Sequence, residues 1–172
     1  MFALRAKRGE LLIRRGTGDR TPLRFPADGT SVPTSVDVTI SSAQLLALFA
    51  TPQPIVAAPG AGFANIFEGI GIHKPAGTAY GGIAAGEDLS VKYTDAAGLE
   101  QCQVETTGFL DQATAQFRYG KAHTAASLIS SITPVANAAL VLQILTGEIT
   151  TGDSPLYCRV FYRGVPTALI IA

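Results

Sequence analysis

The sequence predicts an all-β fold, a β-sandwich or a barrel-like sheet, with one or two short helices and an extended N-terminal arm. Three observations carry this prediction. From residue 34 onward, strand-like runs alternate with turn signals at intervals of about ten residues. Good helix formers gather in one short run, and residues 1–33 differ from the rest in charge and proline content. The length of 172 residues suits one β-rich domain, 34–172, behind this arm.

Charged residues are scarce for a soluble protein. They make up 15% of the chain, against about 25% in an ordinary soluble domain. A monomer needs charge on its exposed faces, so we expect part of the surface to be covered by copies of the chain or by another protein.

The arm, residues 1–33, is basic. It holds seven basic residues and three acidic ones, so its formal charge is +4 and that of residues 34–172 is −4. The basic residues are Arg5, Lys7, Arg8, Arg14, Arg15, Arg20 and Arg24. Segments 2–6 and 11–15 flank a turn at Gly9 and predict a hairpin, or two pieces that lie along a neighbour. Segment 16–33 contains three prolines and predicts an extended linker or loop.

The first part of the β-rich domain contains a strand and the best helix. Residues 35–40 alternate between polar and apolar side chains, which predicts a half-buried strand. Ser41 or Ser42 can cap a helix over 43–50, which must end before Pro52 because the residue before a proline avoids the helical conformation.

The middle of the chain predicts further short strands. These cover 54–58, 63–73, 78–83, 87–94 and 99–107, with a turn at 95–98. In 108–136, Phe109, Ala113 and Phe117 have helical spacing, and flanking glycines leave either a short helix or a loop.

The last part of the chain again predicts strands, over 139–146, 156–163 and 165–171, with a turn-rich connection at 147–153. Pro166 would stand at the start of the final strand. In the strand 156–163, one face would carry Leu156, Cys158, Val160 and Tyr162, and the other Tyr157, Arg159, Phe161 and Arg163. Aromatic residues on both faces predict that the core covers one face and a partner the other.

The sequence contains almost none of the residue patterns that are typical of catalytic or metal sites. His73 and His123 are isolated, and Cys102 and Cys158 are 56 residues apart with no Cys-x-x-Cys motif. The two thiols are expected to be buried and free, with a bridge between them left open. The glycine clusters at 59–62 and 69–71 lack the rest of a phosphate-binding motif and predict turns and bulges. We therefore expect no enzyme, no cofactor and no metal.

Nucleic acid and membranes are not expected partners. The basic arm lacks interleaved aromatic residues, and the acidic remainder of the chain would repel phosphates. Apolar runs are interrupted well before the roughly 18 residues of a membrane span, and no signal peptide is recognisable. We therefore expect the protein to be made and used in the cytoplasm, or to reach the outside by another route.

Several runs, taken in order, resemble small structural proteins of tailed bacteriophages that are described as capsid decoration or cement proteins. They are VTISSAQLLAL (38–48), IVAAPGAG (55–62), GTAYGG (77–82), DLSVKY (88–93), ALVL (139–142), TGD (151–153) and RVFY (159–162). The resemblance covers about 36–164 and leaves the arm outside.

The resemblance implies a β-rich virion protein on the capsid exterior that binds the major capsid protein, commonly as a homotrimer, and stabilises the shell. From the residues themselves, the candidate contacts are Arg5, Lys7, Arg8, Arg14 and Arg15 of the arm, and Tyr157, Arg159 and Phe161 of the domain. Two alternatives remain open. One is a tail or baseplate component of the same virion. The other is a non-catalytic β-sandwich module that binds a small ligand or a carbohydrate. Such a module would need an exposed aromatic platform, and the sequence contains no Trp.

Overall fold

The computed structural model describes residues 4–7, 10–13, 23–25, 34–122 and 133–169. The chain divides into two compact units, Met1–Pro33 and Thr34–Ala172. In the first unit only the course of the strands is described, and in the second the side chains are described as well.

The N-terminal unit contains an antiparallel sheet with the strand order β1-β2-β3. β1 (Leu4–Lys7) and β2 (Glu10–Ile13) form the hairpin predicted around Gly9. β3 (Leu23–Phe25) pairs with β2 and corrects the expectation that 16–33 is only a linker. In β3 two apolar residues flank Arg24.

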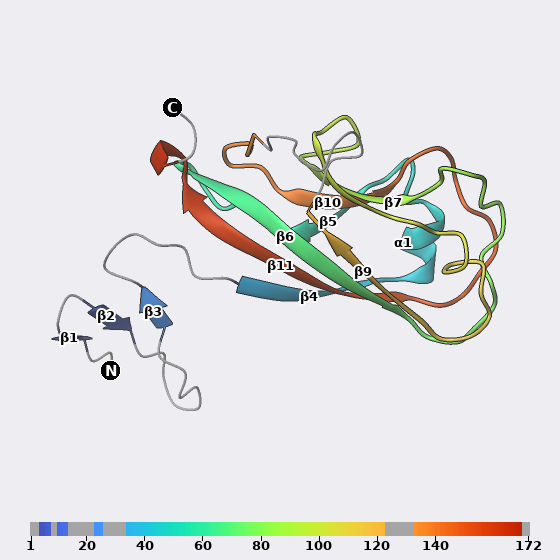
Figure 1. Ribbon diagram of the computed structural model, residues 1–172, viewed down its shortest axis with the longest axis horizontal. Helices are drawn as coiled ribbons and strands as arrows, with labels where there is room; N and C mark the ends of the chain where they lie inside the picture. Colours follow the sequence, from blue (N-terminus) through green and yellow to red (C-terminus); the bar gives the residue numbers. More distant parts are fainter. Residues whose placement is uncertain (1–3, 8–9, 14–22, 26–33, 123–132, 170–172) are drawn as a thin grey trace. The chain divides into compact units, whose positions relative to one another are not determined.

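The larger unit is a sandwich of two four-stranded antiparallel sheets, which confirms the all-β prediction (Figure 1). One sheet has the order β5-β10-β7-β8, formed by Gln53–Val56, Leu140–Ile144, Leu89–Tyr93 and Glu100–Val104. The other has the order β4-β11-β6-β9, formed by Thr34–Ile40, Leu156–Pro166, Phe63–Lys74 and Gln116–Lys121.

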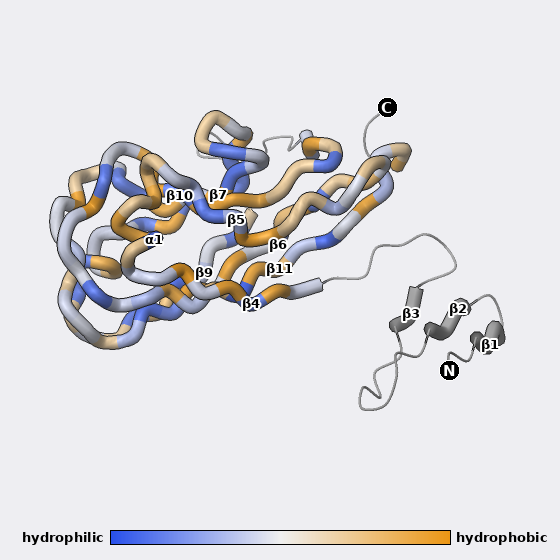
Figure 2. The backbone as a smooth tube through the Cα atoms, turned by 180° about the vertical axis from the view of Figure 1, so that it is seen from behind, coloured by the Kyte–Doolittle hydropathy of each residue, from blue (hydrophilic) through white to orange (hydrophobic). Residues whose placement is uncertain are grey.

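The core lies between the two sheets. Ile70, Ile72 and Val160 point into it from one sheet, and Val91 and Leu142 from the other, all of them at most 1% exposed. Figure 2 shows the same pattern along the chain, with hydrophobic stretches on the strands and hydrophilic ones in many of the connections. Alternation at period two therefore buries one face of β11 between Leu156 and Val160, whereas all five residues of β10 are buried.

Helix α1 (Ser42–Leu46) connects the sheets and begins with a capping box. The Ser41 hydroxyl accepts a hydrogen bond from the Gln44 N–H, and the Gln44 side chain accepts one from the Ser41 N–H. The helix ends earlier than the predicted residue 50, since 47–50 form turns. Leu45 and Leu48 are nonetheless completely buried, so the whole run covers the end of the core.

Two predictions for the middle segment need correction. Instead of a strand at 78–83 there is a single bridge between Gly81 and Thr150, because Gly82 has a positive φ of 75° that breaks the extended course. In the segment predicted as a short helix or a loop, 108–115 form a loop with turns, but β9 occupies 116–121. Phe109 belongs to a preceding turn and is buried, so its spacing from Phe117 does not reflect a helix.

The prediction of a separate final strand at 165–171 is also wrong. β11 continues without a break to Pro166, where it pairs with Phe63 of β6, and a 3-10 turn, η1 (Thr167–Leu169), follows. The pairing of Gly164 and Val165 with β6 keeps the backbone extended through this segment. In the described part of the chain, no helix has the length and apolar character that crossing a membrane would require.

Candidate binding face

The outward face of the β4-β11-β6-β9 sheet gathers aromatic side chains from three strands. The strand register places them in rows across the sheet. The first row is Thr39, Tyr157, His73 and Phe117, and the second is Asp37, Arg159, Gly71 and Tyr119. The third row is Ser35, Phe161, Gly69 and Lys121. The predicted contact residues Tyr157, Arg159 and Phe161 therefore lie on one face, as their alternation indicated.

Glycines form the floor of this face on the central strand β6. A Cβ atom added to Gly71 would lie 3.3 Å from Cζ of Phe117, and one added to Gly69 would lie 2.7 Å from the hydroxyl of Tyr119. The two rings of β9 therefore lean over the glycine backbone, where any larger residue would displace them. The glycine cluster 69–71 lies beside the register shift of β6 and β11, which confirms the predicted bulge.

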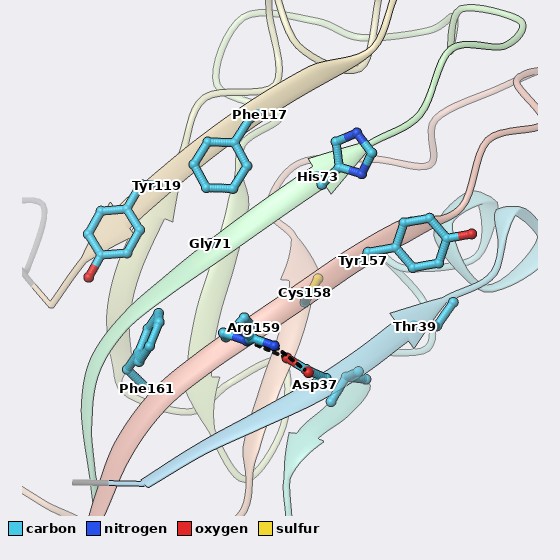
Figure 3. A pocket seen from close by; sticks show the side chains of 11 residues that line it. Asp37, Thr39, Gly71, His73, Phe117, Tyr119, Tyr157, Cys158, Arg159 and Phe161 are labelled. Carbon is cyan, nitrogen blue, oxygen red and sulfur yellow. Dashed lines mark hydrogen bonds and ion pairs between the residues drawn. The ribbon is translucent and has the colours of Figure 1, made fainter.

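The rings on the face are open to solvent. Phe117 is 61% exposed, Tyr119 52% and Tyr157 49%. Figure 3 shows several of them with their flat faces toward the viewer, above the plane of the sheet. The planes of His73 and Tyr157 differ by only 19°, with ring centroids 6.1 Å apart. Tyr119 and Phe161 lie 6.3 Å apart at an angle of 60°. Together these rings border a hollow of about 600 Å³.

An ion pair lies within the aromatic face. Nε and Nη2 of Arg159 each donate to a different oxygen of Asp37 over 2.7 Å, with both side chains more than half exposed. The hydrogen bond from Arg159 holds the pKa of Asp37 below its usual range, and the same bond raises the pKa of Arg159. The pair is thus ionised and carries no net charge at neutral pH.

The basic residues proposed for the arm lie largely outside the description. Arg5 and Lys7 belong to β1, whose side chains are not described, and Arg8, Arg14 and Arg15 lie outside the described residues. His123 lies outside them as well.

Sequence reasoning missed four members of the face: Asp37, His73, Phe117 and Tyr119. The alternation of its strand puts Asp37 on the polar side. It does not reveal the ion pair, because the partner Arg159 is 122 residues away in the sequence. Alternation of Phe117 and Tyr119 with smaller or polar residues was the available signal for β9, and the helical spacing of Phe109 and Phe117 obscured it.

The remaining chemistry-bearing groups have structural partners or are buried. Cys102 and Cys158 are free and buried, and desolvation raises the pKa of each thiol to about 12. In 34–122 and 133–169, no three His, Cys, Asp or Glu residues lie close enough together to hold a metal ion. Lys74 is fully buried, and its Nζ donates to the carbonyl of Gln112 over 2.6 Å.

Several loop carboxylates bind backbone N–H groups. Glu87 accepts from Ala84 over 2.6 Å, Glu148 from Ala50 over 3.1 Å, and Asp153 from Thr78 over 2.7 Å. These acids therefore satisfy loop donors that would otherwise lack a partner.

Comparisons with known proteins add no further information about this face. The chain matches no family model, no curated protein and no solved structure.

Proposed function

We propose that this chain is a non-catalytic structural protein that binds the outer surface of a tailed-phage head and stabilises the lattice of the major capsid protein. The observation that carries the proposal is the division of the chain into two compact units of opposite charge. The first unit has a net charge of +4 and the second −4. The resemblance of 36–164 to capsid decoration proteins supplies the setting.

Two units on one chain suit a protein that connects subunits. Once one unit is bound to a capsid subunit, the other meets a neighbouring surface at a high effective concentration, so two modest contacts give tight attachment. A homotrimer would multiply these contacts further, since closed symmetric assemblies present the same surfaces several times. The scarcity of charge, 15% of the chain, agrees with a surface that is partly covered in such an assembly.

The basic unit is the proposed contact with the capsid protein. Arginine suits this role because its planar fork binds carboxylates in a bidentate manner. The predicted second contact at Tyr157, Arg159 and Phe161 presents a small area. A large aromatic side chain has roughly 150–250 Å² of surface, and the three most exposed rings of this face are 49–61% exposed. That leaves roughly 300 Å² of exposed ring, so these rings alone supply less than half of the roughly 800 Å² per partner of a stable protein interface.

The proposal is tested with the purified full chain and with empty, expanded heads of the phage that encodes it. Light scattering gives the mass in solution, and co-sedimentation with heads gives binding. A trimer that sediments with heads and raises their melting temperature is the expected result. A chain that remains in the supernatant at every salt concentration would overturn the proposal.

Charge variants locate the contact. The triple variant R5Q/R8Q/R14Q should bind heads more weakly and lose much of the salt dependence of binding, because it removes three of seven positive charges of the first unit. The variant K92Q is the control, since Lys92 is a cation of the second unit on β7, in the sheet that does not carry the aromatic face. Equal loss in both would argue against the arm as the contact.

A further inference from the structure

We propose that the aromatic face of the β4-β11-β6-β9 sheet is a binding site for a neutral saccharide chain. This inference goes beyond the capsid role and does not depend on it. It rests on the flat, exposed rings of Phe117, Tyr119 and Tyr157, on the glycine floor beneath them, and on the ion pair of Arg159 and Asp37 among them.

The size of the face favours a slender ligand over a folded partner. The exposed ring area of roughly 300 Å² supplies by itself well under half of the area that a second copy of the chain would need for a stable interface. The hollow of about 600 Å³ instead falls within the range of ligand sites, which is about 300–1,000 Å³. A chain of sugar rings that crosses the sheet would fill it without large buried area.

The rings lie in a suitable orientation for stacking. Gly69 and Gly71 have no side chains, so Phe117 and Tyr119 lie across the backbone and turn their flat faces outward (Figure 3). The face of an aromatic ring is the negative end of its quadrupole. It attracts the weakly positive C–H groups that one side of a pyranose ring presents. The near-parallel planes of His73 and Tyr157 extend the platform across two more strands.

The charge of the hollow's lining favours a neutral ligand, because its charged residues are Asp37 and Arg159. The next cation on the face, Lys121, lies in the third row, outside that lining. Arg159 donates two hydrogen bonds to Asp37, and the positive charge of the guanidinium cancels the negative charge of the carboxylate. A nucleic acid would also stack on aromatic rings, but its backbone requires a positive groove. The exposed carboxylate of Asp37, on the edge strand β4, would oppose a phosphate that approaches the Arg159 guanidinium.

The polar groups beside the rings distinguish a saccharide from a proline-rich peptide. A polyproline segment has carbonyl acceptors and no backbone donors, so it would leave Asp37 without a new partner. Sugar hydroxyls both donate and accept. They can donate to Asp37 and accept from the remaining N–H groups of Arg159. The hydroxyls of Tyr119 and Tyr157 have no hydrogen-bond partner among the described residues and remain available as well.

The experiment titrates the full chain with four glucose-type hexasaccharides by calorimetry: β-1,4-glucan, β-1,3-glucan, α-1,4-glucan and the β-1,4-linked N-acetylglucosamine hexamer. A thymidine oligonucleotide and a ten-proline peptide are the competing probes. Binding of at least one hexasaccharide with a Kd below about 1 mM is the expected result. If all four hexasaccharides fail, or if either competing probe binds more tightly than all of them, the saccharide assignment is wrong.

Variants place the binding on the face. F117A/Y119A removes two rings and should weaken hexasaccharide binding by about tenfold or more. D37N keeps the shape of the carboxyl group but replaces one acceptor oxygen with an amide donor, and it should weaken binding several-fold. The control F63A removes an exposed ring from the far end of β6, where Phe63 is 45% exposed, and should leave the Kd unchanged. Unchanged circular dichroism confirms folding of each variant, and equal binding by F117A/Y119A and the parent chain would overturn the proposal.

Discussion

Gly120 of β9 shows how a single residue fixes the distance between the two sheets. A Cβ atom at this position would lie 2.5 Å from Sγ of Cys102 and 2.7 Å from a methyl group of Val104. Both residues belong to β8, an edge strand of the other sheet. The missing side chain thus allows β9 to close one side of the sandwich.

G120A should destabilise the protein by about 1–3 kcal/mol, because the added methyl group forces β8 and β9 apart. G164A is the matched control on β11, where a Cβ atom would meet nothing within 4 Å. That variant should be neutral or stabilising by about 0.4–1 kcal/mol, through the smaller freedom of the unfolded chain. Urea unfolding of both measures the difference, and equal stability of the two variants would contradict the close packing at Gly120.

The ion pair on the binding face makes a prediction about protonation. NMR titration of the carboxyl carbons should give Asp37 a pKa below its usual range, because Arg159 donates two hydrogen bonds to it. In R159M the pKa should return toward its ordinary value. Since the pKa is lower in the folded state than in the unfolded state, the contribution to stability is present above the unfolded pKa and is lost as the pH falls through the folded pKa. An Asp37 pKa that R159M leaves unchanged would show that the pair does not form in solution.

Among the elements, α1 is short enough that its cap decides its stability. Ser41 and Ser42 were both candidates from the sequence, and the structure assigns the cap to Ser41 through its reciprocal hydrogen bonds with Gln44. A five-residue helix has little intrinsic stability, so it depends on this cap and on the burial of Leu45.

S41A should therefore cost about 1 kcal/mol of unfolding free energy, the usual effect of removing a helix cap. S42A, which lies one residue further on and makes no capping bond, should cost less than about 0.5 kcal/mol. Thermal unfolding followed by circular dichroism compares them. If S42A were as unstable as S41A, the assignment of the cap to Ser41 would be wrong.

The elements that could be predicted from the sequence are those with a strict local pattern. Alternation located β4 and β11, and the sides of β11 came out correctly: Leu156, Cys158 and Val160 are buried, while Tyr157 is half exposed. β9 was missed because its alternation is inverted, with the aromatic Phe117 and Tyr119 exposed and the polar Arg118 on the inner side, and because Phe117 also has helical spacing from Phe109. The inner side of β9 carries Arg118 in place of an apolar residue. Its guanidinium carbon lies 5.3 Å from the centre of the Phe109 ring.

The binding face could be predicted only in part, because it is a property of the sheet order. The strand 156–163 predicted an outward aromatic side, yet β11 pairs with β4 and β6 at sequence separations of more than 80 residues. No local pattern announces that Gly71 lies between Arg159 and Tyr119. Register over such separations is set by the fit of the whole core.

At the scale of the whole molecule, four buried groups make the free energy of unfolding depend on pH in the alkaline range. Burial raises the pKa of Cys102, Cys158, Tyr80 and Tyr93 to about 12 each, from ordinary values of 9.0 for the thiols and 10.0 for the phenols. Tyr80 donates its hydroxyl to the carbonyl of Ser154 over 2.5 Å, and Tyr93 donates to that of Asn65. Both hydroxyls bond as donors, which also favours the protonated form in the folded state.

These shifts predict that the protein loses stability as the pH rises from about 9 toward 12. The folded pKa values lie above the unfolded ones, so the stabilisation is complete below the unfolded pKa and disappears on approach to the folded pKa. Each group then contributes a slope of up to about 1.4 kcal/mol per pH unit. Urea unfolding from about pH 8 to about pH 11 measures the total slope, and C158A should reduce it by the share of one thiol. Because C158A is less stable at neutral pH through its cavity, the comparison uses the slope and not the absolute free energy. A free energy of unfolding that stays constant over this range would show that the four groups are not buried together in one cooperative core.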